Sequence, residues 1–441
     1  MTVFAYSPPF AHVKLLSRNA TPRTQHYQQL GFFISPAGVW IAAAALDDNP
    51  TSDDYLVTGT TSQFFRSSDG GVTWTASSAV TGYCATLFSV GSDVYMFTLS
   101  TQHGSLQIRK STDDGVTWGS VVTISAEGAA GTEPNYYVVP PKPLITGGRV
   151  YMPVVSVPNP ASSWINGAKL QLCHASTSAD LTDPSSWTFS NNVQISGTLI
   201  NGDTSKGFWE PNILLDQNGD CKIVTRVNSD LRINLGAVVD VTLGESASIS
   251  YNTTTGLRTV PGGHVFYKVL WDSQSQKYLA ISTRNTRGNA NSTDFIQRTV
   301  LQLISSPDLT TWTHVADIVR EPQYETLEKT ILAGWQYSDW EFDGNDIVGI
   351  IRVGEYGIAI NQHQASAIYF VRIKNYYPNL LAAAPTNSGA SPSSPHAAVT
   401  GGGPFGFSSF GRSAFGAYET GRSIFVPYVV VCPRCLGSGV I

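Results

Sequence analysis

One eight-residue pattern occurs twice in this chain and constrains its fold more than any other feature. The sequence reads SSDGGVTW over residues 67–74 and STDDGVTW over residues 111–118. An Asp followed two residues later by Gly is typical of a turn, because the carboxylate accepts backbone N–H groups and Gly adopts positive φ without steric cost. We therefore expect two hairpin turns, each followed by a Trp that packs into a neighbouring layer. Such duplication favours a repeat architecture over two unrelated hairpins.

Two degenerate copies extend the repeat. Ser306–Trp312 keeps the Ser, Asp and Trp with one residue fewer, and Ser178–Trp187 has two residues more. The four Trp residues are separated by 44, 69 and 125 positions in chain order. Because a four-stranded propeller blade takes ~40–50 residues, these intervals fit repeats of blade length with some insertions.

The composition favours many short strands joined by turns. Charged residues make up only 13% of the chain, which contains 40 Gly and 24 Pro, whereas ~25% charged residues is usual. No stretch shows sustained helical periodicity. β-rich runs separated by turn clusters lie at Gly31–Leu46, Val94–Ser100, Arg149–Val157, Cys221–Val227, Tyr278–Thr283, Asp346–Val353 and Ala367–Ile373. We expect an all-β fold, a six-bladed β-propeller over residues 31–379, with residues 1–30 as an N-terminal arm or first strand.

Several classes of function are disfavoured by charge and hydropathy. The longest apolar run, Val39–Leu46, is far shorter than the ~20 residues of a membrane span. The N-terminal residues have no basic region followed by an apolar core, so we expect no secretory signal and leave the location open. A net charge of −5 without basic clusters disfavours a nucleic-acid partner, since phosphate contacts need concentrated Lys and Arg.

The last 60 or so residues differ in character from the rest. Residues 380–400 are rich in Ala, Pro and Ser and indicate a linker. Residues 401–441 form the predicted assembly or attachment segment, with aromatic residues set among Gly and Ser, followed by the apolar run Ile424–Val431. An isolated β-branched run leaves strand edges unpaired, so a partner chain, a homo-oligomer or the propeller itself must cover it. A folded-back stabilising strand is the alternative.

The five cysteines divide into two groups. Cys84, Cys173 and Cys221 are scattered through predicted strands, which favours buried free thiols. Cys432 and Cys435 form a C-x-x-C pair that resembles half of a zinc knuckle. Without a second ligand pair, we predict neither a metal nor any other cofactor, and a terminal disulfide or an inert pair is the alternative.

The repeated turns resemble the Asp-boxes of sialidase-type six-bladed propellers, which lie on the outer rim and take no part in catalysis. Two further stretches are similar to that family over about Gly31–Tyr377. Glu210 lies in WEPN, 16 residues before Arg226 across an Asn-Gly turn, as in the sialidase blade that carries a glutamate and a carboxylate-binding arginine. Tyr337 precedes a Ser, a strand and an Asp-Gly turn, as the nucleophilic tyrosine of sialidases does.

The resemblance implies catalytic and binding roles for Tyr337, Glu210 and Arg226, and the chemistry of the substrate supports these roles. A 2-keto sugar acid carries its carboxylate at the anomeric carbon, so a carboxylate nucleophile would be repelled there, and sialidases use a tyrosine instead. Tyr337 is then the nucleophile, Glu210 its proton acceptor, and Arg226 a clamp, since a guanidinium donates two parallel hydrogen bonds to a carboxylate.

Other roles stay open at this point. The family's N-terminal Phe-Arg-Ile-Pro pattern is absent, and Arg18 and Arg23 are substitutes by position only. The third arginine is Arg284 or Arg352. An acid catalyst is expected before the first repeated turn, with Asp48 preferred among the acidic residues Asp47, Asp48, Asp53 and Asp54. We interpret His363 as a structural or rim residue.

These observations predict a protein that recognises, and cleaves, an acidic cell-surface glycan of the sialic-acid type. A non-catalytic adhesin is the alternative, for instance a virion spike or tail protein that attaches to host glycans. A scaffold propeller without any ligand is a third possibility. Fold resemblance alone does not decide among them.

Overall fold

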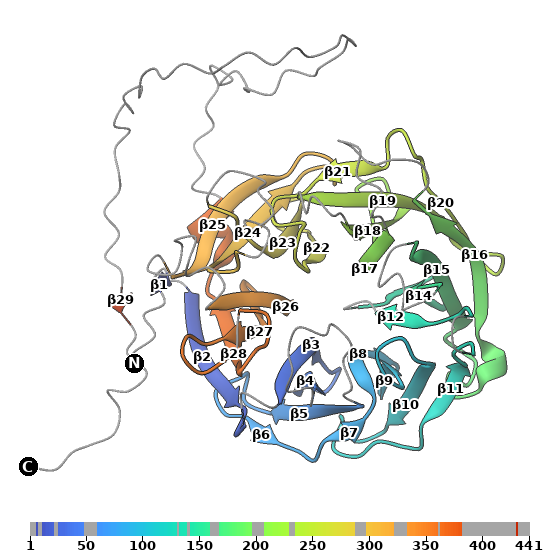
Figure 1. The fold of residues 1–441 in the computed structure, drawn as a ribbon, viewed down its shortest axis with the longest axis horizontal. Helices are drawn as coiled ribbons and strands as arrows, with labels where there is room; N and C mark the ends of the chain where they lie inside the picture. The colour runs from blue at the N-terminus through green and yellow to red at the C-terminus, as the bar shows by residue number, and fades with distance from the viewer. Residues whose placement is uncertain are drawn as a thin grey trace, which may run out of the picture.

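Six small antiparallel sheets form a ring in the computed structural model of this chain (Figure 1). The predicted all-β, six-bladed β-propeller is thereby confirmed. The residues that the structure describes are 6–7, 11–21, 25–47, 60–129, 132–138, 142–158, 167–195, 207–228, 234–286, 297–321, 333–359, 362–381 and 429–430.

Blades 1 to 3 follow one another in chain order, and each begins at the centre of the ring (Figure 1). Blade 1 contains β3 (His26–Ile34), β4 (Trp40–Asp47), β5 (Thr61–Ser67), β6 (Thr75–Ala76) and β7 (Val80–Thr81). Blade 2 contains β8 (Tyr83–Val90), β9 (Asp93–Leu99), β10 (Leu106–Ser111) and β11 (Val122–Ser125). Blade 3 contains β12 (Tyr136–Val138), β13 (Leu144–Thr146), β14 (Arg149–Ser156), β15 (Lys169–Ser176) and β16 (Thr188–Gln194).

Blades 4 to 6 complete the ring in the same manner. Blade 4 contains β17 (Gly207–Leu215), β18 (Cys221–Asn228), β19 (Leu235–Thr242), β20 (Ser248–Ser250) and β21 (Leu257–Thr259). Blade 5 contains β22 (Lys268–Asp272), β23 (Lys277–Thr283), β24 (Val300–Ser306) and β25 (Thr313–Arg320). Blade 6 contains β26 (Gly334–Asp343), β27 (Asp346–Gly354), β28 (Ala367–Ile373) and β2 (Ala11–Arg18). All of the β-rich runs expected from the sequence contain strands, and Gly31–Leu46 divides into β3 and β4.

The ring is closed by a strand from the N-terminal region. β2 pairs antiparallel with β28, in register from Ala11 with Ile373 to Arg18 with Ala367. At the end of this pairing the Arg18 guanidinium donates to both oxygens of Glu355, at 2.7 and 2.5 Å. The first and last segments of the propeller are therefore joined within one blade, which leaves no open edge between them.

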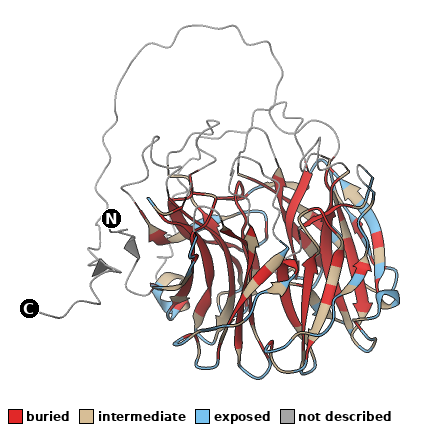
Figure 2. Cartoon of the chain, turned by 60° about the horizontal axis from the view of Figure 1, so that its bottom comes forward, coloured by how far each residue is buried: buried red, intermediate tan, exposed pale blue. Residues whose placement is uncertain are grey.

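Burial follows the position of a strand within its blade. The middle strands β14, β27 and β28 are buried on both faces, because neighbouring blades pack against both sides of each sheet. Outer strands such as β16 are mostly exposed or half-buried instead. Figure 2 shows the buried residues along the inner and middle strands and the exposed residues at turns and outer edges. This packing explains why many strands read as continuous apolar runs.

The two repeated turns fold alike. In the first, Ser67 Oγ accepts the Gly71 N–H at 2.8 Å and Asp69 accepts the Thr73 N–H at 2.8 Å. In the second, Ser111, Gly115, Asp113 and Thr117 make the equivalent bonds at 2.8 and 2.9 Å.

The Trp after each turn packs between blades, as predicted. Trp74 lies 5.8 Å from Phe370 of blade 6, and Trp118 lies 5.6 Å from Phe64 of blade 1, measured between ring centroids. Trp187 of blade 3 is 5.6 Å from Phe97 of blade 2. In each of these repeats, the large aromatic side chain after the turn therefore packs one blade against its neighbour.

In the described chain, two short strands extend the sheet of blade 5, and two short helical segments lie between or after the strands. β1 (Tyr6–Ser7) pairs with β25, and β29 (Val429–Val430) pairs with β1. A 3₁₀ helix lies at Pro184–Ser186 and a π-helical turn at Tyr377–Leu381. No helix in the described ranges has the length and hydropathy of a bilayer span. The predicted buried free thiols Cys84, Cys173 and Cys221 are confirmed.

Candidate functional site

Four of the inner strands carry a register break near the start of the strand. At the equivalent point Cys84, Glu210 and Tyr337 have positive φ of 58°, 52° and 53°, which non-glycine residues adopt rarely. A bulge re-aims the side chains beside it, and strained backbone of this kind is concentrated at functional sites. The breaks lie at Tyr27–Leu30, Tyr83–Thr86, Trp209–Asn212 and Gln336–Asp339.

Glu210 and Arg226 form a buried ion pair at the centre of the ring. Arg226 Nη1 donates to Glu210 Oε2 at 3.1 Å, and the two side chains are 10% and 1% exposed. The pair forms because Arg226 of β18 lies opposite Trp209 of β17, over whose ring its guanidinium stacks at 4.0 Å. Burial alone would lower the pKa of Arg226, but the charge of Glu210 and hydrogen bonds to Glu210 and Tyr337 raise it.

Tyr337 is enclosed by aromatic and cationic groups. Its ring stacks on Phe266 with centroids 5.6 Å apart and planes 5° from parallel, and the edge of His363 approaches at 6.4 Å. The Arg352 guanidinium lies 4.1 Å from the ring centroid and that of Arg298 lies 5.8 Å away. The predicted Tyr337, Glu210, Arg226 and Arg352 are therefore neighbours in space, although they come from blades 4 and 6.

Arg298 is a member of this cluster that the sequence did not reveal. It lies just before β24, is 8% exposed, and its Nε and Nη1 atoms have no hydrogen-bond partner among the described residues. Burial lowers its pKa to about 10, with the charges of Arg352 and Arg226 adding to the effect. Arg284 follows β23 and Arg298 precedes β24, so both lie at the same end of this hairpin. Their positions in the sequence therefore do not show which of them belongs to the cluster.

Arg352 is fixed by two glutamines. Its Nη1 donates to Gln28 Oε1 at 2.7 Å and its Nη2 to Gln336 Oε1 at 3.4 Å. Gln28 also donates to Asp47 Oδ2 at 3.3 Å. Because Gln28 lies at the register break of β3, blade 1 contributes a neutral amide at the position where blades 4 and 6 carry Glu210 and Tyr337.

The remaining predicted residues lie elsewhere or outside the described chain. Arg284 turns away from the centre: its Nη1 pairs with Asp317 at 2.9 Å and its side chain is 37% exposed. Arg18 closes the ring through Glu355. Six of the candidates fall outside the described residues, namely Arg23, Asp48, Asp53, Asp54, Cys432 and Cys435. The described residues contain no group of three potential metal ligands.

The electrostatics of the cluster favour an anion. Arg226, Arg298 and Arg352 converge on Tyr337, and each has at least one nitrogen without a hydrogen-bond partner within the described chain. Glu210 Oε1 is also unpartnered there. Buried polar atoms are normally paired, so such a concentration indicates groups arranged for a ligand. Carboxylates and phosphates are the anions that guanidinium groups bind through paired, charge-assisted hydrogen bonds.

Comparisons with known proteins give the fold. No protein-family model matches the sequence, and no curated protein does either. A mutant of the NanB sialidase from Streptococcus pneumoniae has 10% sequence identity to this chain. The two structures superpose with a TM-score of 0.54 over 83% of this chain and 71% of the sialidase chain. A Dyadobacter fermentans protein of unknown function has 12% identity and a TM-score of 0.54 over 82% and 99%. An α-L-arabinanase from Penicillium chrysogenum has 14% identity and a TM-score of 0.48 over 85% and 98%. The chain is thus a propeller of the sialidase-like fold.

Proposed function

We propose that this propeller binds an acidic, sialic-acid-type sugar at the end of a glycan and hydrolyses its glycosidic bond. The observation that carries the proposal is the convergence of three buried arginines, Arg226, Arg298 and Arg352, on Tyr337. We assign these arginines to the sugar carboxylate, with Arg298 in the role that the sequence had left to Arg284 or Arg352. The similarity of the turns at Asp69 and Asp113 to Asp-boxes supports the same family.

The proposed chemistry follows from the roles assigned to Tyr337 and Glu210, which both act on the charge of Arg226. Tyr337 Oη attacks the anomeric carbon while its proton passes to Glu210, and the bond to the leaving oxygen breaks. A neutral phenol is suited to this attack because the substrate carboxylate repels an anionic nucleophile. Water then attacks the anomeric carbon and breaks its bond to Tyr337 Oη. Glu210 returns the proton to Tyr337, and the carboxylate of the residue that protonated the leaving oxygen takes the proton of the water. Burial in a low-dielectric setting strengthens each of these charge interactions.

An acid must protonate the leaving oxygen. Asp48 is the residue proposed for this step. Its neighbour Asp47 is hydrogen-bonded to Gln28, which in turn contacts Arg352. This chain of contacts places Asp47 two hydrogen bonds from Arg352, and Asp48 is the next residue in the sequence.

A glycan-binding adhesin without catalysis is the second candidate. It is favoured by Gln28, which occupies the inner-strand position of blade 1 and binds Arg352. A guanidinium held by two neutral amides is preorganised to bind a carboxylate, and binding alone needs no catalytic group beside it. In this case the protein attaches to acidic glycans, for instance as a spike or tail protein of a virus particle.

The test is release of free sugar acid from a panel of sialylated and related acidic glycans. The wild-type protein is compared with Tyr337→Phe and with Tyr95→Phe, a matched control whose ring stacks on Phe88 in blade 2. Release that persists in Tyr95→Phe and collapses in Tyr337→Phe is the expected result. If all three proteins bind the glycans and none releases sugar, the adhesin function is supported. If none of them binds or releases sugar, both proposed functions are contradicted.

A further inference from the structure

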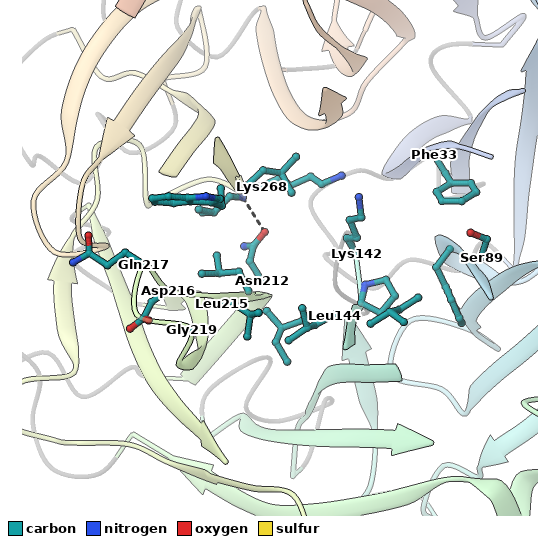
Figure 3. A pocket seen from close by; sticks show the side chains of 18 residues that line it. Phe33, Ser89, Lys142, Leu144, Asn212, Leu215, Asp216, Gln217, Gly219 and Lys268 are labelled. Carbon is teal, nitrogen blue, oxygen red and sulfur yellow. Dashed lines mark hydrogen bonds between the residues drawn. The ribbon is translucent and has the colours of Figure 1, made fainter. Parts of the chain in front are cut away.

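A pocket lies at the ends of the inner strands opposite to the arginine cluster. It has a volume of ≈ 750 Å³, within the ~300–1,000 Å³ of typical ligand pockets. Figure 3 shows side chains from several blades around it, including Phe33, Leu144 and Leu215. Leu215 is five residues beyond Glu210 on β17, which corresponds to ~16 Å along a strand. We call this cavity the strand-end pocket; it is separate from the arginine cluster.

The strand-end pocket favours an apolar occupant. Its walls come mainly from apolar side chains such as Phe88, Ile145 and Trp271. Its two lysines are paired: Lys142 donates to both oxygens of Glu341 at 2.9 and 2.8 Å, and Lys268 donates to Asp339 at 2.5 Å and to Glu341 at 3.1 Å. Because each ammonium group is matched by a carboxylate, the charged groups give no strong attraction for an ion.

The chain leaves the propeller against blade 5, whose inner strand β22 supplies one wall of this pocket. After β28 the Tyr376 hydroxyl donates to Asp272 Oδ1 at 2.7 Å, and Asp272 follows the pocket residue Trp271 in β22. The π-helical turn Tyr377–Leu381 comes next. Farther along the chain, β29 reaches blade 5 again through β1 and β25. Both ends of the intervening segment are therefore attached to the blade that supplies one wall of the pocket.

The composition of that segment matches the pocket. Between Gly401 and Arg422 the apolar side chains are mainly aromatic, set among Gly, Ser and Ala: Phe405, Phe407, Phe410, Phe415 and Tyr418. Phe405 is 24 residues beyond Leu381, and a chain of that length can reach at most ~80 Å when fully extended. A tethered segment reaches a nearby site at an effective concentration of about millimolar, well above that of a second molecule in dilute solution.

We propose that aromatic side chains of residues 405–418 dock in the strand-end pocket of the same chain. This contact anchors the C-terminal segment to the face opposite the arginine cluster. It is independent of the proposed glycosidase function, because no pocket residue belongs to that cluster.

Photo-crosslinking in the full-length protein tests the contact. A benzophenone amino acid replaces Ile145, a pocket residue that is 42% exposed, so that the substitution is tolerated. The matched control carries it at Val72, which is 65% exposed on the turn after β5. Equal amounts of light and heavy isotope-labelled protein are mixed, illuminated and digested. Crosslinks from position 145 to peptides of residues 401–422 within one isotope form are expected, with none from position 72.

Three results overturn the proposal. They are absence of crosslinks to residues 401–422 from position 145, equal crosslinking from both probes, and crosslinks between light and heavy chains, which assign the pocket to a second copy. Changing the four Phe residues of the segment to Ser in the Ile145 probe protein is expected to abolish the crosslink. Its persistence would also contradict an aromatic anchor.

Discussion

Glu210 in β17 and Tyr337 in β26 have the same left-handed backbone conformation, with φ of 52° and 53°, and both raise the pKa of Arg226. The two strands belong to blades 4 and 6, so they reach the same point from different sides of the ring. Each such conformation costs about 1–3 kcal/mol in a non-glycine residue. Two strained residues that meet at the arginine cluster indicate that the backbone of the inner strands positions these side chains at some expense of folding stability.

Arg298 is expected to contribute directly to binding of an acidic sugar. Its buried guanidinium has unpartnered nitrogens, so Arg298→Ala removes hydrogen bonds to a ligand carboxylate without breaking a bond within the described protein. Such bonds to charged groups are worth about 1.5–3 kcal/mol, and we expect the Kd for the free sugar acid to rise roughly 10- to 100-fold. Isothermal titration calorimetry measures the change.

The matched control for that experiment is Arg284→Ala. Arg284 follows β23 at the same end of the hairpin as Arg298, but it pairs with Asp317 outside the cluster. This variant should bind like the wild type. Equal weakening in both variants would show that general positive charge, and not the cluster, attracts the ligand.

The fold was predictable because turn chemistry and aromatic spacing are local. Asp69 and Asp113 make the bonds expected of their turns, and Trp74 and Trp118 pack between blades as their fixed offset indicated. The closing role of β2 was not predictable in the same way. Its pairing with β28 joins residues more than 300 positions apart, and no local signal specifies the partner of a strand.

The candidate site was predictable only in part. Tyr337, Glu210 and Arg226 lie in stretches that resemble sialidase motifs. Arg298 and Arg284 flank the same hairpin, and only the structure shows that the side chain of Arg298 lies beside Tyr337 whereas that of Arg284 pairs with Asp317. Cys84 was interpreted as a buried thiol, which is correct, but its position equivalent to Glu210 and Tyr337 depends on a bulge in β8. A bulge is set by packing between strands, and the sequence of β8 carries no mark of it.

Gly71 is expected to be a tightly constrained position between blades. It has φ of +82°, and a Cβ there would lie 2.8 Å from Trp40 and 2.9 Å from Phe370. Gly38 has a similar φ of +79°, with nothing within 4 Å of its Cβ position. Gly71→Ala should lower the free energy of unfolding by about 1–3 kcal/mol more than Gly38→Ala does. Urea unfolding of both variants gives the difference, and equal losses would mean that backbone conformation alone matters there.

Glu321 is expected to make stability depend on pH. Burial raises its pKa to about 8 from 4.5, and the carboxylate of Glu355 adds to the rise. Between these values the folded protein holds a proton that the unfolded chain has lost, so this contribution to stability is complete below pH 4.5 and is lost as the pH rises to about 8. The slope is at most about 1.4 kcal/mol per pH unit.

Glu321→Gln removes that titration and keeps the size of the side chain. The free energy of unfolding of this variant, measured by urea titration across the same range, should fall less steeply with rising pH than that of the wild type. Parallel profiles for the two proteins would show that another group is responsible for the wild-type slope.

Lys268 is expected to be essential for the junction of three blades. Its ammonium group bonds to Asp339 of β26 at 2.5 Å, and Asp339 also accepts the Phe32 N–H of β3 at 2.7 Å. Lys268→Met leaves Asp339 as a buried, unpaired charge, which costs about 3–5 kcal/mol. Lys142→Met, at a pair whose lysine is 41% exposed, should cost no more than about 1 kcal/mol. Adding Asp339→Asn to Lys268→Met should recover part of the lost melting temperature, because the amide needs no counter-charge. A double variant no more stable than Lys268→Met would assign the loss to packing of the lysine stem instead.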